Sequence, residues 1–183
     1  MEAITPEMLR ELLRYDRDTG KLFWRKRHPN TFANARAAAC WIARFPGRET
    51  FLHLGRGGYL AGNLFKRSLL AHRVAWAIET GSWPRGALDH VNGDRTDNRF
   101  CNLREATRDE NARNARPRGG ASRFKGVTWH EKSEAWRARI RLHGRNASLG
   151  LFASEIDAAK AYDAAALKHF GEYARPNFPE VRA

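Results

Sequence analysis

The chain has 183 residues, and its 33 Lys and Arg residues against 20 Asp and Glu give a formal net charge of +13. This length allows one domain or two small ones with modest cores. So large a surplus on a small chain indicates a polyanionic partner, either nucleic acid or an anionic surface. The alternative is a charged surface kept for solubility, but the uneven placement of the cations favours the polyanion.

Cysteines and apolar segments exclude several other classes of protein. Cys40 and Cys101 lie far apart and neither belongs to a C-x-x-C pair, so no disulfide framework and no Cys-type zinc site are expected. Cys101 is expected to be a small buried residue. No apolar run approaches ~20 residues and no basic-then-apolar leader is seen, so we expect a soluble cytoplasmic protein that does not contact membranes.

The N-terminal part alternates short helices and strands. Residues 5–13 predict a helix with a Thr N-cap and a Pro at its first position. Residues 21–24 predict a strand, and the Gly-rich turn at 56–58 predicts a hairpin. Residues 72–78 predict a short helix ended by a glycine. Residues 26–50 give no readable pattern.

The segment 86–116 is the most informative part of the chain. Asp89 and His90 stand side by side at an expected strand end, followed by a polar loop and by Asn102. Thr107 is expected to cap a helix that carries Asn111. One carboxylate, one imidazole and several amides in a small space suit a single-metal site that cuts phosphodiesters. They offer oxygen ligands for a hard divalent cation and a neutral base for water.

The residue pattern of this segment also allows other interpretations. A lone Asp-His pair is more often an exposed turn, and only the full spacing favours catalysis. The loop also contains Asn92, Asp94 and Asp97, but no Glu stands at the twelfth position of a calcium loop. His72 is either a support for the site or a packed helix residue.

The C-terminal segment predicts a small sheet with one helix. In residues 136–143, apolar side chains alternate with Arg or His, so one face of a strand is apolar and the other cationic. A turn at Gly144 leads into a strand over 145–152, where Ala147, Leu149 and Leu151 are expected to share a face. Ser154 is expected to cap a helix whose small residues let it approach the sheet closely.

The sheet, and not the helix, carries the positive charge: residues 121–152 sum to +5 and residues 154–170 to −1. An ordinary solvated strand face mixes signs, and like charges along one strand cost stability unless an anion offsets them. A sheet of this kind can enter the major groove of DNA, where Arg reaches guanine edges or phosphates. The candidate DNA-binding residues are Arg123, Lys125, Thr128, His130, Arg137, Arg139, Arg141 and Arg145.

A first resemblance covers most of residues 5–116. The chain is similar to phage-type HNH endonucleases, whose site is a ββα-metal finger, at Asp89-His90-Val91-Asn92-Gly93-Asp94, Asp97-Asn98-Arg99, Asn102-Leu103-Arg104 and Glu110-Asn111. The upstream segments Tyr15–Gly20, His72–Trp76 and Thr80–Pro84 resemble the region that often precedes this motif in phage and prophage proteins.

The resemblance implies a role for each motif residue. Asp89 and Asn111 would hold Mg²⁺, with Mn²⁺ as a substitute and no zinc. His90 would be the general base, and Asn102 would hold the loop and fix the imidazole through backbone hydrogen bonds. Arg108, one turn from Asn111, would bind the scissile phosphate.

A second resemblance covers residues 122–179. The chain looks like an AP2 DNA-binding domain, a module of plant transcription factors and of phage HNH homing endonucleases, at Phe124–Val127, Trp136–Ile140, Leu149–Phe152, Ala158–Ala166 and Asn177–Pro179. The resemblance implies that the cationic sheet docks on duplex DNA.

Together these patterns predict an α+β protein. Residues 1–116 would hold the N-terminal region and the HNH domain, residues 117–121 a basic linker, and residues 122–183 an AP2-like three-stranded antiparallel sheet packed on one helix. The predicted function is an Mg²⁺-dependent DNA endonuclease of the homing or mobile-element type, monomeric and active in the host cell of a phage or prophage. The alternatives are a non-enzymatic DNA-binding regulator with a decayed nuclease half, and an RNA-binding module.

Overall fold

The computed structural model describes residues 3–115 and 121–179, and within them it is a mixed α+β protein whose paired strands are antiparallel. This confirms the predicted α+β class, whereas the specific ββα-metal and AP2-like arrangement stays a prediction. The chain divides into two compact units, Met1–Ala106 and Thr107–Ala183. The division falls earlier than the predicted boundary at residue 116, because the helix after Thr107 belongs to the second unit. Residues 117–120 of the predicted linker lie outside the described residues.

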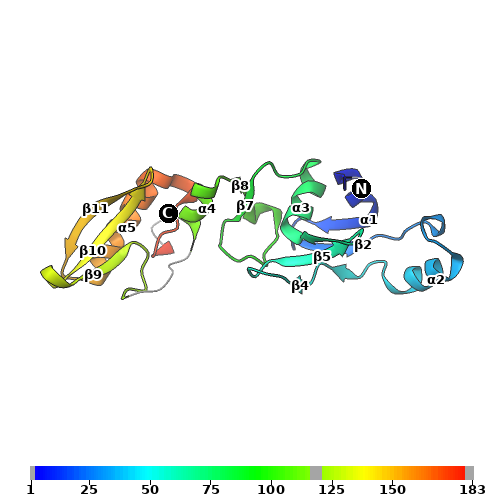
Figure 1. Ribbon diagram of the computed structural model, residues 1–183, viewed down its shortest axis with the longest axis horizontal. Helices are drawn as coiled ribbons and strands as arrows, with labels where there is room; N and C mark the ends of the chain where they lie inside the picture. The colour runs from blue at the N-terminus through cyan, green and yellow to red at the C-terminus, as the bar shows by residue number, and fades with distance from the viewer. Residues whose placement is uncertain (1–2, 116–120, 180–183) are drawn as a thin grey trace. The chain divides into compact units, whose positions relative to one another are not determined.

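The first unit contains most of the short elements (Figure 1). They are α1 (Pro6–Leu12), β1 (Leu13–Asp16), β2 (Lys21–Trp24), η1 (Pro29–Thr31), α2 (Ala35–Arg44), β3 (Glu49–Thr50), β4 (His53–Leu54), β5 (Leu60–Leu64), β6 (Arg67–Leu70), α3 (Ala71–Thr80), β7 (Ala87–His90), η2 (Phe100–Asn102) and β8 (Leu103–Ala106). The strands form the sheets β1-β2-β3 and β4-β5-β6 and the hairpin β7-β8. The predicted helices α1 and α3, strand β2 and the β4-β5 hairpin are confirmed.

Local signals explain where the first unit's helices begin and end. Thr5 caps α1, since its Oγ1 accepts a hydrogen bond from the Met8 amide at 3.3 Å. Gly81 ends α3 in the left-handed region at φ 76°, which glycine adopts without strain. These signals therefore set where α1 begins and where α3 ends, and the two helices pack against each other.

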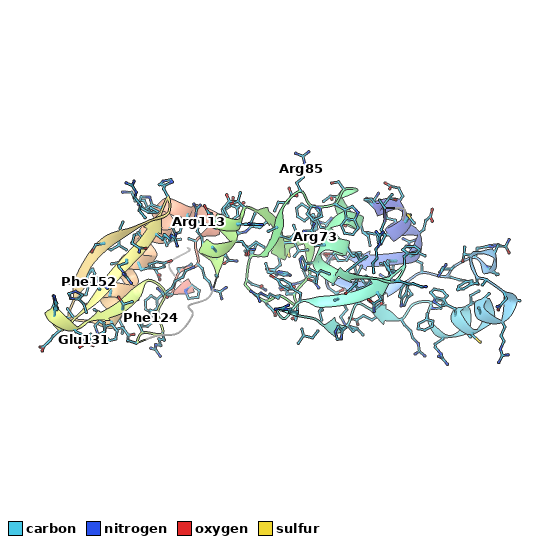
Figure 2. The ribbon with its side chains drawn as sticks, viewed as in Figure 1. Arg73, Arg85, Arg113, Phe124, Glu131 and Phe152 are labelled. Carbon is cyan, nitrogen blue, oxygen red and sulfur yellow. The ribbon has the colours of Figure 1, made fainter. Side chains whose placement is uncertain are left out.

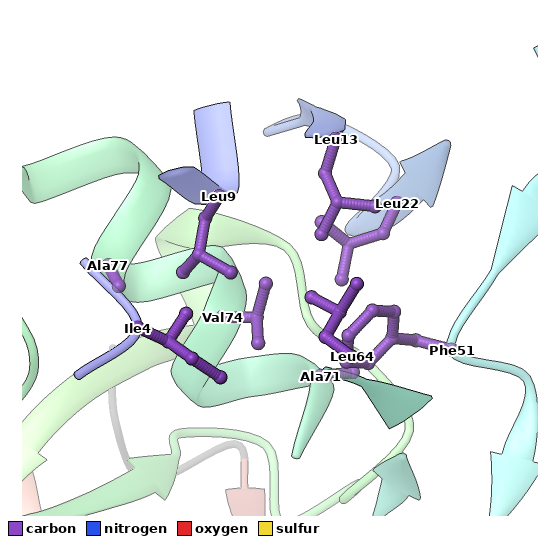
Figure 3. Packing of buried hydrophobic residues seen from close by; sticks show 9 residues of the cluster. All are labelled: Ile4, Leu9, Leu13, Leu22, Phe51, Leu64, Ala71, Val74 and Ala77. Atoms are coloured by element: carbon purple, nitrogen blue, oxygen red, sulfur yellow. The ribbon is translucent and has the colours of Figure 1, made fainter. Parts of the chain in front are cut away.

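One hydrophobic core joins these elements (Figure 3). Its buried members are Ile4, Leu9, Leu13, Leu22, Phe51, Leu64, Ala71, Val74 and Ala77. Burying one such Leu side chain contributes about 1.5–3 kcal/mol. The core fixes α3, and α3 in turn carries the residues that line the site described below.

The second unit is a sheet with one long helix on its face. Its elements are α4 (Arg108–Asn114), β9 (Val127–His130), η3 (Glu131–Ser133), β10 (Ala135–Leu142), β11 (Arg145–Phe152), α5 (Glu155–Phe170) and η4 (Gly171–Tyr173). The sheet order is β11-β10-β9. Ala158 and Tyr162 of α5 pack on Ala138 and Ile140 of β10 in two adjoining clusters. At Gly126 a Cβ would lie 2.0 Å from the Tyr162 ring, so the close approach requires glycine.

Strand β11 departs from the predicted alternation. A β-bulge opposite Ala138 and Arg139 leaves Leu149 without a cross-strand partner, so Leu149 and Gly150 both lie on the helix-facing side. Leu151 then pairs with Arg137 on the other face and is 50 % exposed. The expectation that Leu151 shares a face with Ala147 and Leu149 is wrong, because one extra residue inverts the alternation.

The prediction that Cys101 is buried is also wrong. Cys101 is exposed in the single-turn helix η2, whose neighbouring Asn102 is 5 % exposed and points inward. Among residues 3–115 and 121–179, no helix is long and apolar enough to cross a bilayer.

Candidate functional site

Asp89 and His90 end strand β7 in the first unit, and both are buried, at 4 % and 3 % exposed. In the β7-β8 hairpin Asp89 lies opposite Arg104 and His90 opposite Leu103. The approach to β7 is fixed by Arg73 of α3, which donates to the carbonyl of Gly86 at 3.0 Å (Figure 2). Hairpin geometry therefore presents a carboxylate and an imidazole at one strand end.

The carboxylate of Asp89 is held by a buried ion pair. Arg104 donates to its Oδ2 from Nη2 at 2.7 Å and from Nε at 3.0 Å. The two side chains are 5 % and 14 % exposed. Such a pair fixes the carboxylate's direction, and removal of one partner leaves an uncompensated buried charge. The motif contains Arg104, but the sequence alone gives it no role, because its pairing with Asp89 depends on the register of the two strands.

The His90 ring is oriented by Asn98. His90 Nε2 lies 3.1 Å from Asn98 Oδ1, and Asn98 is itself 2 % exposed. An amide oxygen accepts, so Nε2 carries the proton and the lone pair stands on Nδ1. Burial lowers the pKa of His90, an effect that the Asn98 bond and nearby carboxylates oppose. The ring is therefore neutral and able to accept a proton at physiological pH.

Two rings from the upstream region pack on His90. The His72 ring meets the His90 ring edge-on, with centroids 5.2 Å apart, and Tyr59 lies 5.9 Å from His90. His72 is 4 % exposed and its Nδ1 has no hydrogen-bond partner. Burial, with smaller effects from His90 and Arg73, lowers the pKa of His72 to about 3. His72 is thus both a packed helix residue and a neighbour of the site.

Asn102 ties together the loop that follows His90. Its Oδ1 accepts from the Asn92 amide at 2.9 Å, and its Nδ2 donates to the Asp97 carbonyl at 2.8 Å. The Val91 amide donates to the Asn102 carbonyl at 2.9 Å. These bonds agree with a loop-holding role, but the imidazole itself is held by Asn98.

Carboxylate oxygens of Asp94 and Asp97 accept hydrogen bonds from within the loop. Asp94 Oδ1 accepts from the Thr96 amide at 2.9 Å, and Asp97 Oδ2 accepts from Arg99 Nη2 at 2.6 Å. The Arg99 hydrogen bond is the largest cause of the lowered pKa of Asp97. In the described ranges, no three His, Cys, Asp or Glu side chains gather as a metal-binding group.

Arg108 and Asn111 lie on α4 in the second unit. Thr107 and Glu110 cap this helix reciprocally, with the Glu110 amide 3.2 Å from Thr107 Oγ1. Arg108 is exposed and Asn111 half-buried. Because Asp89, His90 and Asn102 belong to the first unit, convergence of all five residues stays a prediction.

The C-terminal end of α4 is anchored inside the second unit. Lys125 Nζ donates to the carbonyls of Arg113 and of Ala115, the latter at 2.9 Å. The guanidinium of Arg113, which is labelled in Figure 2, lies 4.7 Å from the centroid of the Phe170 ring. Burial, followed by repulsion from Arg175, lowers the pKa of Lys125 to about 8. Lys125 thus caps the end of α4, and its contact with DNA stays a prediction.

A row of cations follows the face of the sheet opposite α5. Arg137, Arg139 and Arg141 alternate with the buried Ala138 and Ile140. Their cross-strand neighbours are polar or apolar without charge: Thr128, Leu151, Ser148 and Asn146. Across the described residues these three arginines form no salt bridge.

Two polar atoms in this row lack partners. Thr128 Oγ1 and Arg137 Nε are buried and form no hydrogen bond, and their residues pair across β9 and β10. A buried donor without a partner costs about 1–3 kcal/mol, so both atoms are suited to an acceptor from outside the protein.

The other candidates lie at the margins of this face. Arg145 pairs with Leu142, whose side chain packs on the core cluster. The register therefore places Arg145 at the hairpin end, out of line with the arginine row, and its contact with DNA stays a prediction. His130 Nδ1 lies 3.1 Å from Ser133 Oγ. Arg123 is exposed and stacks over Phe124.

Comparison with known proteins gives matches of two kinds. The sequence model of a family described as HNH endonuclease matches residues 69–113, which include His72, Asp89, His90 and Asn111. Protein 3.8 of Escherichia phage T7 is 30% identical over 83 residues, which cover 44% of this chain and 69% of that protein. The chain belongs to the HNH endonuclease family. The chain is also similar, over 61 residues, to an AP2-like transcription factor.

The AP2-like similarity is to plant proteins. The AP2-like ethylene-responsive transcription factor AIL7 of Arabidopsis thaliana is 49% identical over 61 residues, or 32% of this HNH-family chain. The factor ANT of the same plant is 31% identical over 143 residues, or 74% of this chain. The chain spans only 12% of the length of AIL7 and 25% of that of ANT.

Proposed function

We propose that the chain is an Mg²⁺-dependent endonuclease of the homing or mobile-element type that hydrolyses phosphodiester bonds in duplex DNA. The observation that carries the proposal is the buried, neutral His90 imidazole beside the Asp89 carboxylate, within the residues that match the HNH family. The chain acts as a monomer with one site, in the host cell of a phage or prophage.

His90 is the general base of this proposal. Nδ1 takes a proton from the attacking water, while Nε2 stays bound to Asn98 Oδ1. General-base assistance of this kind contributes about 10²–10⁴-fold to the rate. Asn102 holds the loop that carries Asn98, and Arg108 binds the scissile phosphate.

Asp89 and Asn111 are the proposed ligands of the cation. A carboxylate and an amide oxygen fit Mg²⁺, which takes few protein ligands and is exchangeable for Mn²⁺. When bound, the cation neutralises charge on the phosphate and the leaving oxygen. Arg104 already donates to Asp89 Oδ2, so a cation there shares this carboxylate with the guanidinium.

The sheet of the second unit is the proposed targeting surface. Three arginines without ion pairs and two unpartnered polar atoms, on Thr128 and Arg137, support docking of that face on phosphate or base acceptors. Rows of Arg neutralise phosphates and release counterions, so binding weakens steeply with salt.

A plasmid-nicking assay tests the enzymatic part. Wild-type protein with Mg²⁺ or Mn²⁺ is expected to nick or linearise supercoiled plasmid. His90→Ala should lower the rate by about 10²-fold or more. Binding to a labelled duplex in EDTA is the control, and it should be equal for both proteins. Equal cleavage by both would remove His90 from the mechanism.

One observation favours a second candidate, a DNA-binding regulator with a decayed nuclease half. Arg104 occupies Asp89 Oδ2 in a buried ion pair, which competes with a cation. A regulator of this kind binds duplex DNA with the expected salt dependence and leaves the plasmid intact with either cation. Cleavage that requires His90 would exclude it.

A further inference from the structure

Residues 25–48 form the most strongly charged segment of the first unit. They contain six Arg and Lys residues and no Asp or Glu, so they hold +6 of the chain's +13. The cations are Arg25, Lys26, Arg27, Arg36, Arg44 and Arg48. The proposed nuclease chemistry and the arginine row of the sheet use none of them. We call this segment the basic arm.

The basic arm has a rigid support of its own. Trp41 of α2 packs against Trp24, Phe32 and Phe45, with ring centroids 5.9, 5.5 and 5.6 Å apart. Such ring pairs add about 0.5–1.5 kcal/mol each beyond the area they bury. Asn34 caps α2, since its Oδ1 accepts from the Ala37 amide at 2.8 Å. The helix is thus a fixed platform.

The other side of α2 presents cations to solvent. Arg36 and Arg44 are exposed and lie two helical turns apart, so they share a face. Between them stand only the small side chains of Ala39, Cys40 and Ala43, which let a partner's surface come close. Figure 1 shows α2 standing apart from α1 and α3.

Among the described residues the exposed cations of the basic arm have no acidic partner, although Arg25 Nε donates to the Leu13 carbonyl at 3.0 Å. In the described ranges none of its Arg or Lys side chains forms a salt bridge with an acidic residue. Like charges packed on a short segment repel each other, and an external polyanion offsets that cost. The half-buried aromatic side chains of the arm pack on one another around Trp41, so its apolar side is already occupied and not free to enter a membrane surface.

We infer that the basic arm is an additional DNA contact, in which Arg36 and Arg44 bind phosphates of duplex DNA beside the cleavage site. This inference rests on the proposed function, which makes duplex DNA the substrate. Phosphate contacts position a protein without reading sequence. The arm therefore adds affinity at any sequence, while specificity stays with other residues.

The test compares two double variants with equal loss of charge. Arg36→Gln with Arg44→Gln removes two cations from the arm. Lys160→Gln with Lys168→Gln removes two exposed cations from α5, the helix on the opposite face from the arginine row. Affinity for a labelled 40-base-pair duplex is measured by fluorescence anisotropy from low to high NaCl, in EDTA, with circular dichroism melts to check folding.

The arm variant should lower the slope of log K against log salt by about 1.8, since each phosphate contact contributes about 0.9. At moderate salt its Kd should rise roughly tenfold. The α5 variant should keep the wild-type slope. Equal slopes for the two variants would overturn the inference.

The design separates this inference from the proposed function. Because binding is measured without a divalent cation, a wild-type protein that binds but leaves plasmid intact overturns the nuclease proposal alone. If the wild type cuts plasmid but the two double variants have equal salt slopes of binding, only the inference about the basic arm is overturned. If a single-stranded RNA competitor displaces the wild type more readily than duplex DNA does, the assignment to duplex DNA is wrong.

Discussion

The β7-β8 hairpin and the β9-β11 sheet handle polar groups in opposite ways. In the hairpin, Asp89 and His90 are buried and bonded to Arg104 and Asn98. On the sheet, Arg137 leaves its Nε without a partner, and no carboxylate pairs with the arginine row in the described part of the chain. Chemistry requires groups already fixed in direction, whereas an electrostatic docking surface is completed only by its ligand.

The sharpest test of the prearranged hairpin is Asn98→Ala. Loss of Oδ1 frees the His90 ring to turn and to change tautomer. Because a misplaced catalytic group costs about 10²-fold, cleavage should fall by roughly that factor while DNA affinity is unchanged. Single-turnover cleavage at saturating protein measures the effect.

Asn98→Asp provides the matched control for that variant. The carboxylate still accepts from Nε2, so most of the rate should return. Its negative charge favours the imidazolium, so the acid limb of the pH–rate profile should move to higher pH. If the Ala and Asp variants cut equally slowly, the orientation argument for Asn98 fails.

The open sheet makes a contrasting prediction. Arg137→Gln with Arg139→Gln should raise the Kd for duplex DNA roughly tenfold or more and lower the salt slope by about 1.8. The catalytic rate at saturating protein should stay the same, because neither residue belongs to the hairpin. Titrations at several salt concentrations measure this, and an unchanged slope would retire that face as the docking surface.

The ring stack around His90 predicts a pH effect of smaller size. His72→Ala admits water to His90 and relieves the burial that lowers its pKa. The acid limb of kcat/KM should therefore move to higher pH, toward the ordinary histidine value near ~6.5. His72→Phe keeps a ring in that place and should leave the limb where it is. An unmoved limb in the Ala variant would count against a role for the stack.

The same histidine predicts how acid unfolds the first unit. Burial lowers the pKa of His72 to about 3. The neutral ring therefore stabilises the native state fully above the unfolded value near ~6.5, and that stability is lost as the pH falls toward 3. His72→Phe cannot be protonated, so its Tm should fall less between pH 7 and pH 4 than that of the wild type. Thermal melts of both proteins across that pH range measure the difference in Tm, and an equal fall would contradict this role of His72.

Most of the fold could be predicted from caps and periodicity, because these act within a few residues. Thr5, Thr107 and Ser154 each cap the helix that the sequence places after them. The face of Leu151 could not be predicted, because a bulge is a property of two paired strands. Cys101 is exposed for a similar reason: the turn of η2 directs its neighbour Asn102 inward.

The site was predictable as a set of residue types, but its partners were not. The motif names Asp89 and His90, whereas Arg104 reaches Asp89 through cross-strand register and Asn98 reaches His90 through the folding of the loop. The rings of Tyr59 and His72 come from the upstream region. The sequence left His72 as either a support for the site or a packed residue, and it gave Tyr59 no role. Contacts between distant segments are set by packing, which a single sequence does not display.

Substitution of Lys125 tests whether the DNA-binding surface extends from the arginine row to the residues that hold α4. Its ammonium binds the carbonyls at the end of α4, so Lys125→Met should destabilise the second unit by about 1–2 kcal/mol through lost hydrogen bonds. Because this cation is already occupied, the salt slope of DNA binding should stay at the wild-type value. Arg139→Met, equal in charge change, should lower that slope by about 0.9. If the two variants lower the slope equally, Lys125 contacts phosphate, and the cationic surface extends to the residues that hold α4.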